Sequence, residues 1–334
     1  MSGRVTAVAP SNLAFVKYWG ARDLERAIPR HPSISMTLSR CRSRCTVAPR
    51  ADQGDEVLLA RQEGVLEVAP EAFAEPVFRH VERLRRRAGG GPSLRVATRN
   101  NFPTGAGLAS SASGFAALTM ACARTFGLDP SPEELSLWAR SSGSGSAARS
   151  TLGGYVEWPT SDGDLEGPAL QLATAEHWDL RNVIALVDPG SKEVSSREGH
   201  RRAESSPHYR RRLQLVPDRL AEVRDAIRER DLERLGPVLE TEAVELHLVA
   251  MSSRPPVFYW SPGTLRVMEA VRALRSEEGV AVYHTIDAGP NVHVICRPED
   301  EERVVERMRA LGPVRDVLRD RVGAGPRYDR EHLL

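Results

Sequence analysis

Hydrophobic and polar positions change their spacing along the chain, and this spacing predicts the elements. In roughly the first hundred residues, short segments with apolar residues at every second position predict strands. Apolar residues at helical spacing predict one helix at 77–88, ended by the glycines at 89–91. The predicted strands are 4–9, 33–38, 45–48 and 94–98, with a hairpin of 57–60 and 65–68. This part is therefore mainly β.

From about residue 110 onward the pattern is mixed. Small and apolar residues predict a buried helix that ends near Gly127, and Ser131 with Glu134 forms a capping box for a helix to about Ser141. Charged residues interleaved with apolar ones at helical spacing predict further helices. The helices are expected within 203–250, 264–276 and 301–311, and the strands at 154–158, 182–187, 281–286, 291–296 and 313–318.

Length and pattern together predict two domains of an α+β protein. The chain has 334 residues, which suggests about two domains. After Asp188-Pro189-Gly190 the sequence becomes charged and helical in pattern, so we expect domains at 1–188 and 189–334. The order helix, strand, strand, helix, strand in the second part fits an α+β sandwich. Without a low-complexity linker, the two parts are expected to pack together around a cleft.

Charge and cysteine content narrow the functional classes. The formal net charge is +1, which argues against a nucleic-acid partner. No apolar run approaches 18 residues and no signal-peptide pattern is seen, so no membrane association is expected. The four cysteines form no CxxC pair, and we expect reduced thiols in a cytoplasmic protein.

The segment 103–111, PTGAGLASS, is the strongest chemical feature. Its glycines and small residues let a ligand approach the backbone closely, and the helix that starts there presents N–H groups that favour phosphate. Ser110 and Ser111 add hydroxyls for phosphate oxygens or a magnesium ion. The segment is neither a Walker A box nor a Rossmann fingerprint. A tight turn before a helix packed through alanines is the alternative.

Two other segments combine polar groups with possible binding chemistry. Segment 10–23 carries Asn12, Lys17, Tyr18 and Trp19, and Lys17 is one of only two lysines among 46 basic residues. Arginine replaces a compact ammonium poorly, so this lysine is notable. The alternative is a strand with a surface lysine and a core tryptophan. Segment 142–154 offers a guanidinium that could clamp carboxylate or phosphate, or it is a flexible loop. Its candidates are Ser144, Ser146 and Arg149.

Two segments in the second half complete the set. Asp287 ends a predicted strand before Ala-Gly-Pro-Asn, where a carboxylate could act as a general base or orient a hydroxyl. A simple turn-forming role is the alternative. Segment 191–200 holds Lys192, Ser195, Ser196 and Arg197 and could bring positive charge over the cleft, unless it is a solvated loop.

Taken in order, these segments resemble the mevalonate diphosphate decarboxylases of the GHMP kinase superfamily. The matching stretches are APSNLAFVKYWGARD at 9–23, PSISMTL at 32–38, NFPTGAGLASSASGFAAL at 101–118, SGSGSAARSTLGGYVEW at 142–158 and TIDAGPNVHVI at 285–295. The resemblance spans nearly the whole chain. It implies a two-domain GHMP kinase fold, with an N-terminal domain like ribosomal protein S5 domain 2 and a ferredoxin-like C-terminal sandwich.

The resemblance also implies an activity and roles for residues. ATP, with Mg²⁺, would phosphorylate the tertiary 3-hydroxyl of a 5-phosphorylated mevalonate, and phosphate would leave with CO2 to give an isopentenyl product. Asp287, Lys17 and Arg149 would be catalytic, with Arg149 holding the substrate carboxylate. The other substrate-binding residues would be Asn12, Tyr18, Trp19, Ser144, Ser146, Ser196 and Arg197. The ATP phosphates would lie on Thr104, Gly105, Ala106, Gly107, Leu108, Ala109, Ser110 and Ser111, with Ser110 as a magnesium contact. A homodimer is expected.

One position departs from the family pattern. Where the family usually reads KYWGKRD, this chain has Ala21, so a lysine near the distal phosphate of the 5-diphosphate is missing. We therefore favour 5-phosphomevalonate as the substrate, giving isopentenyl phosphate. Arg22 could instead supply the charge, and the diphosphate is then the substrate. A mevalonate-type kinase that does not decarboxylate is a further alternative, which Arg149 argues against.

Overall fold

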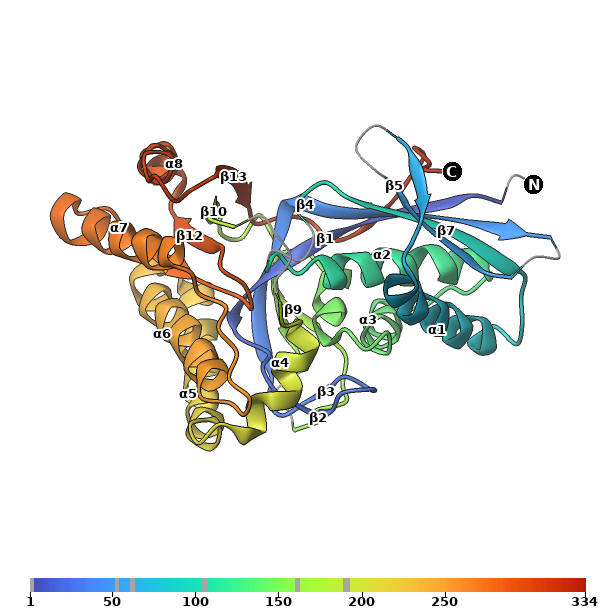
Figure 1. Cartoon of the computed structure of the whole chain (residues 1–334), viewed down its shortest axis with the longest axis horizontal. Helices are drawn as coiled ribbons and strands as arrows, with labels where there is room; N and C mark the ends of the chain where they lie inside the picture. Colours follow the sequence, from blue (N-terminus) through green and yellow to red (C-terminus); the bar gives the residue numbers. More distant parts are fainter. Residues whose placement is uncertain (1–2, 52–53, 61–63, 104–106, 160–162, 189–192) are drawn as a thin grey trace.

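A computed structural model describes residues 3–51, 54–60, 64–103, 107–159, 163–188 and 193–334. Within these ranges the chain forms two sheets with helices packed on them, as Figure 1 shows. The larger sheet and helices α1 to α3 form one part of the molecule. The smaller sheet and helices α5 to α8 form the other. The two-domain α+β fold predicted from the sequence is confirmed.

The larger sheet has eight strands built around two long ones. Its central path runs β14-β1-β4-β7-β5-β6, and β8 and β9 extend it from the other end of β4. All pairs are antiparallel except β5 with β7. The strands are β1 (Val5–Val16), β4 (Ser33–Arg50), β5 (Glu56–Ala60), β6 (Leu66–Val68), β7 (Ser93–Asn100), β8 (Tyr155–Trp158), β9 (Leu170–Ala173) and β14 (Arg327–Asp329). A separate pair is formed by β2 (Ala21–Asp23) and β3 (Ile28–Pro29).

Three helices accompany this sheet. They are α1 (Glu71–Arg87), α2 (Ser110–Thr125) and α3 (Pro132–Arg140), followed by the 3-10 segment η1 (Gly145–Thr151). Helix α2 packs on β1 and β4 through small residues such as Ala116 and Ala117. The capping box predicted for α3 is confirmed, since Ser131 and Glu134 bond each other's backbone. The tight packing of α2 fixes where its first turn points.

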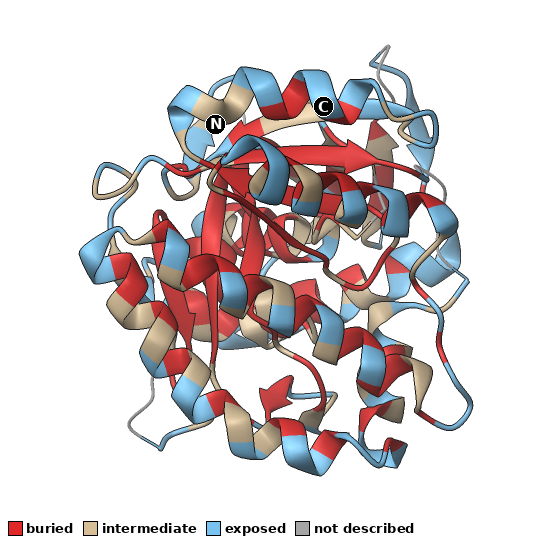
Figure 2. Cartoon of the chain, turned by 90° about the vertical axis from the view of Figure 1, so that its left-hand side faces the viewer, coloured by how far each residue is buried: buried red, intermediate tan, exposed pale blue. Residues whose placement is uncertain are grey.

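The smaller sheet has four antiparallel strands in the order β11-β12-β10-β13. These are β10 (Arg181–Leu186), β11 (Val282–Thr285), β12 (Val292–Cys296) and β13 (Asp316–Arg321). Its helices are α4 (Ser196–Arg202), α5 (Tyr209–Glu229), α6 (Leu232–Met251), α7 (Pro262–Glu278) and α8 (Glu301–Arg309), with 3-10 turns η2 (Ala203–Ser205) and η3 (Pro298–Asp300). Figure 2 shows buried strands behind helices whose outward faces are exposed.

The two sheets do not divide the chain at residue 188. Strand β10 lies before that residue but pairs with β12 and β13 of the smaller sheet. Strand β14, near the C-terminus, returns to pair with β1 of the larger sheet. Asp320 ties the same two regions, because its carboxylate accepts backbone N–H bonds from residues 39–41. The two parts are therefore joined by several chain crossings.

Candidate active site

A cavity of about 410 Å³ lies where the two parts of the molecule meet. Its wall is built from the end of β1, the segment before α2, the segment around η1, helix α4 and the turn after β11. The described residues that line it include Asn12, Lys17, Tyr18, Trp19, Gly107, Leu108, Ala109, Ser110, Ser111, Ser144, Ser146, Arg149, Ser196, Arg197 and Asp287. All described residues assigned to the site from the sequence therefore meet in one cavity.

Lys17 and Asp287 form an ion pair at the centre of this arrangement. Lys17 directly follows β1, and its Nζ donates to Asp287 Oδ1 at 2.6 Å and to the Ala14 carbonyl at 2.7 Å. The Lys17 side chain is 1% exposed and that of Asp287 is 20% exposed. The alternative of a surface lysine is thus excluded. Both residues line the cavity, and the carboxylate is the more exposed partner of the pair.

Burial and pairing act on Lys17 in opposite directions. Removal from water lowers the pKa of Lys17, and the carboxylate of Asp287 raises it by attraction and hydrogen bonding. Glu242 also raises the pKa of Lys17, whereas Arg212 lowers it. The charged form of this lysine therefore depends on the carboxylates around it.

Arg149 is held by side chains of the first strands. Its Nε and one terminal nitrogen donate to Asn12 Oδ1 at 3.3 and 3.1 Å, and its other terminal nitrogen donates to Ser33 Oγ. Asn12 in turn donates to Ser150 Oγ at 2.8 Å. Burial lowers the pKa of Arg149 to about 10, opposed by Asp287, so the guanidinium stays charged at neutral pH. It is a fixed cation beside the ion pair.

The segment before α2 presents the N-terminus of a 16-residue helix to the cavity. Ala109 takes the left-handed conformation at φ 50°, and the Leu108 carbonyl accepts a bond from Ser11 Oγ at 2.5 Å. A Cβ on Gly107, at φ +81°, would lie 3.2 Å from the Gly289 Cα, so the segment touches the turn that carries Asp287. The N–H groups of this first turn fit phosphate oxygens.

The remaining residues predicted to bind ATP phosphates or magnesium fall into two groups, those outside the described residues and those that line the cavity. Thr104, Gly105 and Ala106 lie outside the described residues. Ser110 and Ser111 line the cavity, so their hydroxyls fit a phosphate or an ion carried by it. In the described part of the chain, no group of three His, Cys, Asp or Glu side chains is arranged to hold a metal ion.

Tyr18 and Arg197 both line the cavity, and each contacts a further part of its wall. The Tyr18 ring packs edge-on against Trp158 at 5.2 Å and lies 4.3 Å from the His200 ring. Burial raises the pKa of Tyr18, so its hydroxyl is a donor at neutral pH. Arg197, on α4, approaches Gly143. Lys192 lies outside the described residues.

Ala21 lies in β2, and neither it nor Arg22 is among the described residues that line the cavity. The Arg22 side chain is exposed. Arg26 pairs with Glu166 on the surface. Arg197, unlike Arg22 and Arg26, is among the described residues that line the cavity.

Sequence reasoning missed three residues that support the site. Ser33 contacts Arg149, and Glu242 and Arg212 contact the backbone of residue 17. A signal for Glu242 existed in the sequence. It falls on the apolar face of α6 with Leu235, Leu239 and Leu246, where a lone carboxylate is unusual.

Family models match both parts of the chain. The diphosphomevalonate decarboxylase-like N-terminal domain matches residues 9–167, and the mevalonate 5-diphosphate decarboxylase C-terminal domain matches residues 182–328. The diphosphomevalonate decarboxylase of Ganoderma lucidum is 34% identical, with 96% of this chain and 85% of the relative covered. The phosphomevalonate decarboxylase of Haloferax volcanii is also 34% identical, with 94% of each chain covered.

Solved structures agree with this relationship. A structure of MDDEF in complex with MVAPP, AMPPCP and magnesium has a TM-score of 0.88 and 34% identity, with 98% of each chain covered. Mevalonate diphosphate decarboxylase from Staphylococcus aureus has a TM-score of 0.89 and 31% identity, again with 98% of each chain covered. The chain therefore belongs to the mevalonate diphosphate decarboxylase family, within the GHMP kinase superfamily.

Proposed function

We propose that this protein catalyses the ATP-dependent decarboxylation of mevalonate 5-diphosphate to isopentenyl diphosphate, CO2, ADP and phosphate. The observation that carries the proposal is one cavity that holds the Lys17–Asp287 pair, the buried Arg149 and the first turn of α2. Most of the named relatives are diphosphomevalonate decarboxylases, so we propose the diphosphate as the substrate instead of the monophosphate that the sequence favoured. The preference for the monophosphate is not confirmed.

The residues divide the chemistry between them. Asp287 accepts the proton of the 3-hydroxyl as the oxygen of that hydroxyl takes the γ-phosphoryl group of ATP. In the second step the C3–O bond breaks, phosphate leaves with the electron pair, and the C1–C2 pair becomes the C2=C3 double bond as CO2 departs. Asp287 returns that proton to the departing phosphate, and its carboxylate then stabilises the positive charge that develops at C3. Arg149 orients the carboxylate, although a very strong grip would oppose its departure.

The remaining residues hold phosphate groups. The first turn of α2 and the hydroxyls of Ser110 and Ser111 would bind the ATP phosphates, and Mg²⁺ would neutralise part of their charge. Ser144, Ser146, Ser196, Arg197 and Tyr18 would bind the 5-phosphate end. The AMPPCP and magnesium of the MDDEF complex support this use of the cavity.

A second candidate, decarboxylation of 5-phosphomevalonate, is favoured by one observation. Ala21 supplies no charge, and Arg22 does not line the cavity. A charged hydrogen bond to the distal phosphate contributes about 1.5–3 kcal/mol, or roughly 10- to 150-fold in affinity. The Haloferax volcanii relative, a phosphomevalonate decarboxylase, supports this candidate.

Steady-state kinetics with ATP and each substrate tests both candidates. We expect a higher kcat/KM for the diphosphate, with one CO2 released per ADP formed. A higher value for the monophosphate would replace the first proposal by the second. ADP formation without CO2 would make the protein a kinase. The variant Ala21→Lys, with Ala21→Met as its control, should raise kcat/KM for the diphosphate more than for the monophosphate.

We also propose a homodimer in the cytoplasm. The four cysteines are free and buried, which supports a reducing compartment. In the described residues, no helix has the length and apolar content needed to span a bilayer. Analytical ultracentrifugation tests the assembly, and a single species with the mass of one chain would contradict it.

A further inference from the structure

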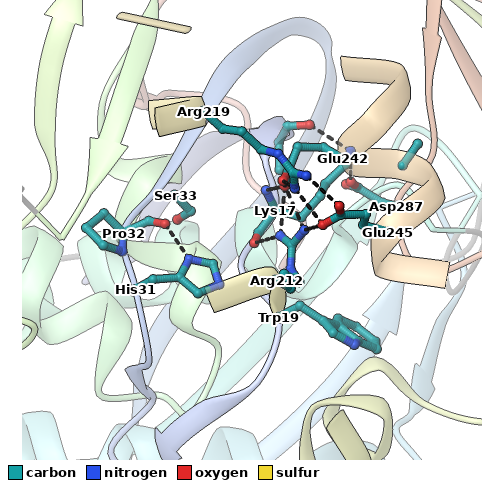
Figure 3. Close-up of polar contacts among 12 residues, drawn as sticks. Lys17, Trp19, His31, Pro32, Ser33, Arg212, Arg219, Glu242, Glu245 and Asp287 are labelled. Atoms are coloured by element: carbon teal, nitrogen blue, oxygen red, sulfur yellow. Dashed lines mark hydrogen bonds and ion pairs between the residues drawn. The ribbon is translucent and has the colours of Figure 1, made fainter. Parts of the chain in front are cut away.

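Two buried side chains of the C-terminal helices form hydrogen bonds with the backbone of Lys17. Glu242 Oε2, on α6, accepts from the Lys17 N–H at 2.7 Å. A terminal nitrogen of Arg212, on α5, donates to the Lys17 carbonyl at 3.0 Å. Figure 3 shows Arg212 and Glu242 beside the backbone of residue 17. Both polar groups of the Lys17 backbone, the N–H and the C=O, are thus bonded to side chains of the other part of the molecule.

The same two side chains also bind each other. The terminal nitrogens of Arg212 donate to both oxygens of Glu242, at 2.9 and 2.7 Å. Arg219 adds a bond to Glu242 at 2.6 Å and two bonds to Glu245. With Lys17 and Asp287, the network holds three cations and three carboxylates. The charges therefore balance without a bound ion.

Burial makes this network rigid. The exposed fraction of Arg212 is 1% and that of Glu242 is 0%. Burial raises the pKa of Glu242, but Arg212, the Lys17 N–H and Arg219 together bring it down to about 2. The carboxylate is thus charged at neutral pH. Because a buried charge cannot exchange its partners for water, its geometry is fixed by the groups that it bonds.

These two hydrogen bonds hold the backbone at the residue that follows β1 and carries the Lys17 ammonium. The Lys17 ammonium is bonded to Ala14 and Asp287, so a shift of its backbone would lengthen the contact with Asp287. Packing of α6 on β1 alone would not fix the direction of the peptide groups around residue 17. Two hydrogen bonds, one to the N–H and one to the C=O, do fix it.

We propose that Glu242 and Arg212 are positioning residues, which hold the backbone of Lys17 so that its ammonium stays on the carboxylate of Asp287. The role rests on the proposed function, because it matters for turnover only if Lys17 and Asp287 act on the substrate. The alternative is a cluster that only stabilises the contact between α5, α6 and β1.

The test compares Glu242→Gln with Glu157→Gln in the full-length protein. Glu157, on β8, is a matched control because it is 4% exposed and accepts two bonds from Arg224 of α5, at 2.8 and 2.6 Å. That pair also joins the larger sheet to α5, but Glu157 is not among the described residues that line the cavity. Both changes remove one buried carboxylate with little change of shape.

Two readouts separate positioning from stability. The first is the split between kcat and the KM for ATP. The second is the pH dependence of trace acetylation at Lys17 with acetic anhydride, read by peptide mapping with Lys192 as the internal reference. The groups that face Lys17 are Asp287, Glu242, Arg212, His247 and His293. Burial lowers the pKa of both histidines to about 4, so they do not titrate between neutral and alkaline pH.

We expect Glu242→Gln to lower kcat by about 100-fold, as for a small misplacement of a catalytic group, with the KM for ATP little changed. Acetylation of Lys17 should begin at lower pH than in the parent, because a carboxylate that raises its pKa is gone. Glu157→Gln should match the parent in both readouts, even where its melting temperature falls. Glu242→Asp should keep the acetylation profile near that of the parent but lower kcat, since its charge remains and its reach is shorter.

The proposal is overturned if Glu242→Gln keeps the parental kcat and acetylation profile. It is also overturned if both Gln variants lose kcat in proportion to their loss of melting temperature. Should Glu242→Gln fail to fold, Glu242→Asp decides, and a parental kcat overturns the proposal. The acetylation profile needs no turnover, so it still reports the grip on Lys17 if the proposed reaction is wrong.

Discussion

Replacing Asp287 by asparagine tests the centre of the proposed site. Asp287→Asn keeps the shape of the side chain and removes its charge. The ammonium of Lys17, which is 1% exposed and 2.6 Å from Asp287 Oδ1, then loses its charged partner. The Ala14 carbonyl remains as an acceptor at 2.7 Å. The change therefore leaves a buried cation without a paired anion.

Two limits set the size of the effect on stability. Removing one partner of a buried ion pair costs about 3–5 kcal/mol. Loss of the Lys17 proton would remove the unpaired charge, but deprotonation of a lysine with the ordinary pKa requires about 4.6 kcal/mol at pH 7. Since Asp287 faces a cavity and is 20% exposed, water can reach the pair and the lower limit applies. We expect the free energy of unfolding to fall by about 3 kcal/mol.

The pH dependence of this loss has a definite sign. Burial already lowers the pKa of Lys17, and loss of Asp287 lowers it further. Between the folded and the unfolded pKa, the unfolded chain binds more protons, so stability rises with pH. The difference between Asp287→Asn and the parent should therefore shrink as the pH rises from ~7 to ~9.5.

Urea unfolding at both pH values measures the stability. Turnover is followed by release of CO2, and nucleotide binding by calorimetry with a non-hydrolysable ATP analogue. We expect turnover to fall by at least ~100- to 10,000-fold, with analogue binding retained. Unchanged turnover would refute the role of Asp287. A stability loss of equal size at both pH values would refute the buried pairing with Lys17.

Three further predictions address the cavity wall and the interior. Arg149→Lys keeps the charge but not the planar fork, and loss of two hydrogen bonds of about 1 kcal/mol each should lower kcat/KM roughly 30-fold; a parental value would contradict the fixed guanidinium. Gly145→Ala places a Cβ 2.7 Å from the Trp158 ring and 2.8 Å from the Tyr18 ring, so Tyr18 must shift and the substrate KM should rise about 10-fold, by initial-rate kinetics. Burial lowers the pKa of four imidazoles to about 3 or about 4, so the unfolded chain binds more protons below pH ~6.5. Each imidazole should therefore lower the free energy of unfolding by about 2 kcal/mol between pH ~7 and ~5. A free energy of unfolding in urea that does not change over this range would contradict their burial as neutral groups. The four are His31, His80, His247 and His293.

The sequence predicted local elements well where their periodicity was regular. Helix α7 and strands β7, β11 and β12 lie within a few residues of their predicted bounds. The two long strands were the exception. Every residue of β1 from Thr6 to Val16 is buried, so only part of it shows alternation, and it was predicted at 4–9 alone. The predicted strands at 33–38 and 45–48 are parts of one strand, β4, whose first six residues are buried on both faces.

Contacts between distant parts of the chain were beyond the sequence. Strand β14 is short and exposed, and pairing with β1 across more than 300 residues leaves no local pattern. The site itself was accessible because its glycines and charges cluster in short segments. Glu242 and Arg212 were missed because each binds a backbone group about 200 residues away along the chain, and the lone carboxylate on the apolar face of α6 gives no hint of that partner.

The charge of the cavity explains why the carboxylate and the lysine occur together. A substrate with a carboxylate and phosphate groups is repelled by an isolated Asp287, yet the proposed chemistry needs that negative charge near C3. Lys17 neutralises Asp287, so that Arg149 and Arg197 leave the wall net positive. The same arrangement leaves Asp287 on the cavity side to meet a developing cation. If this balance is correct, loss of Lys17 should weaken substrate binding as well as turnover, although the ammonium itself is almost completely buried.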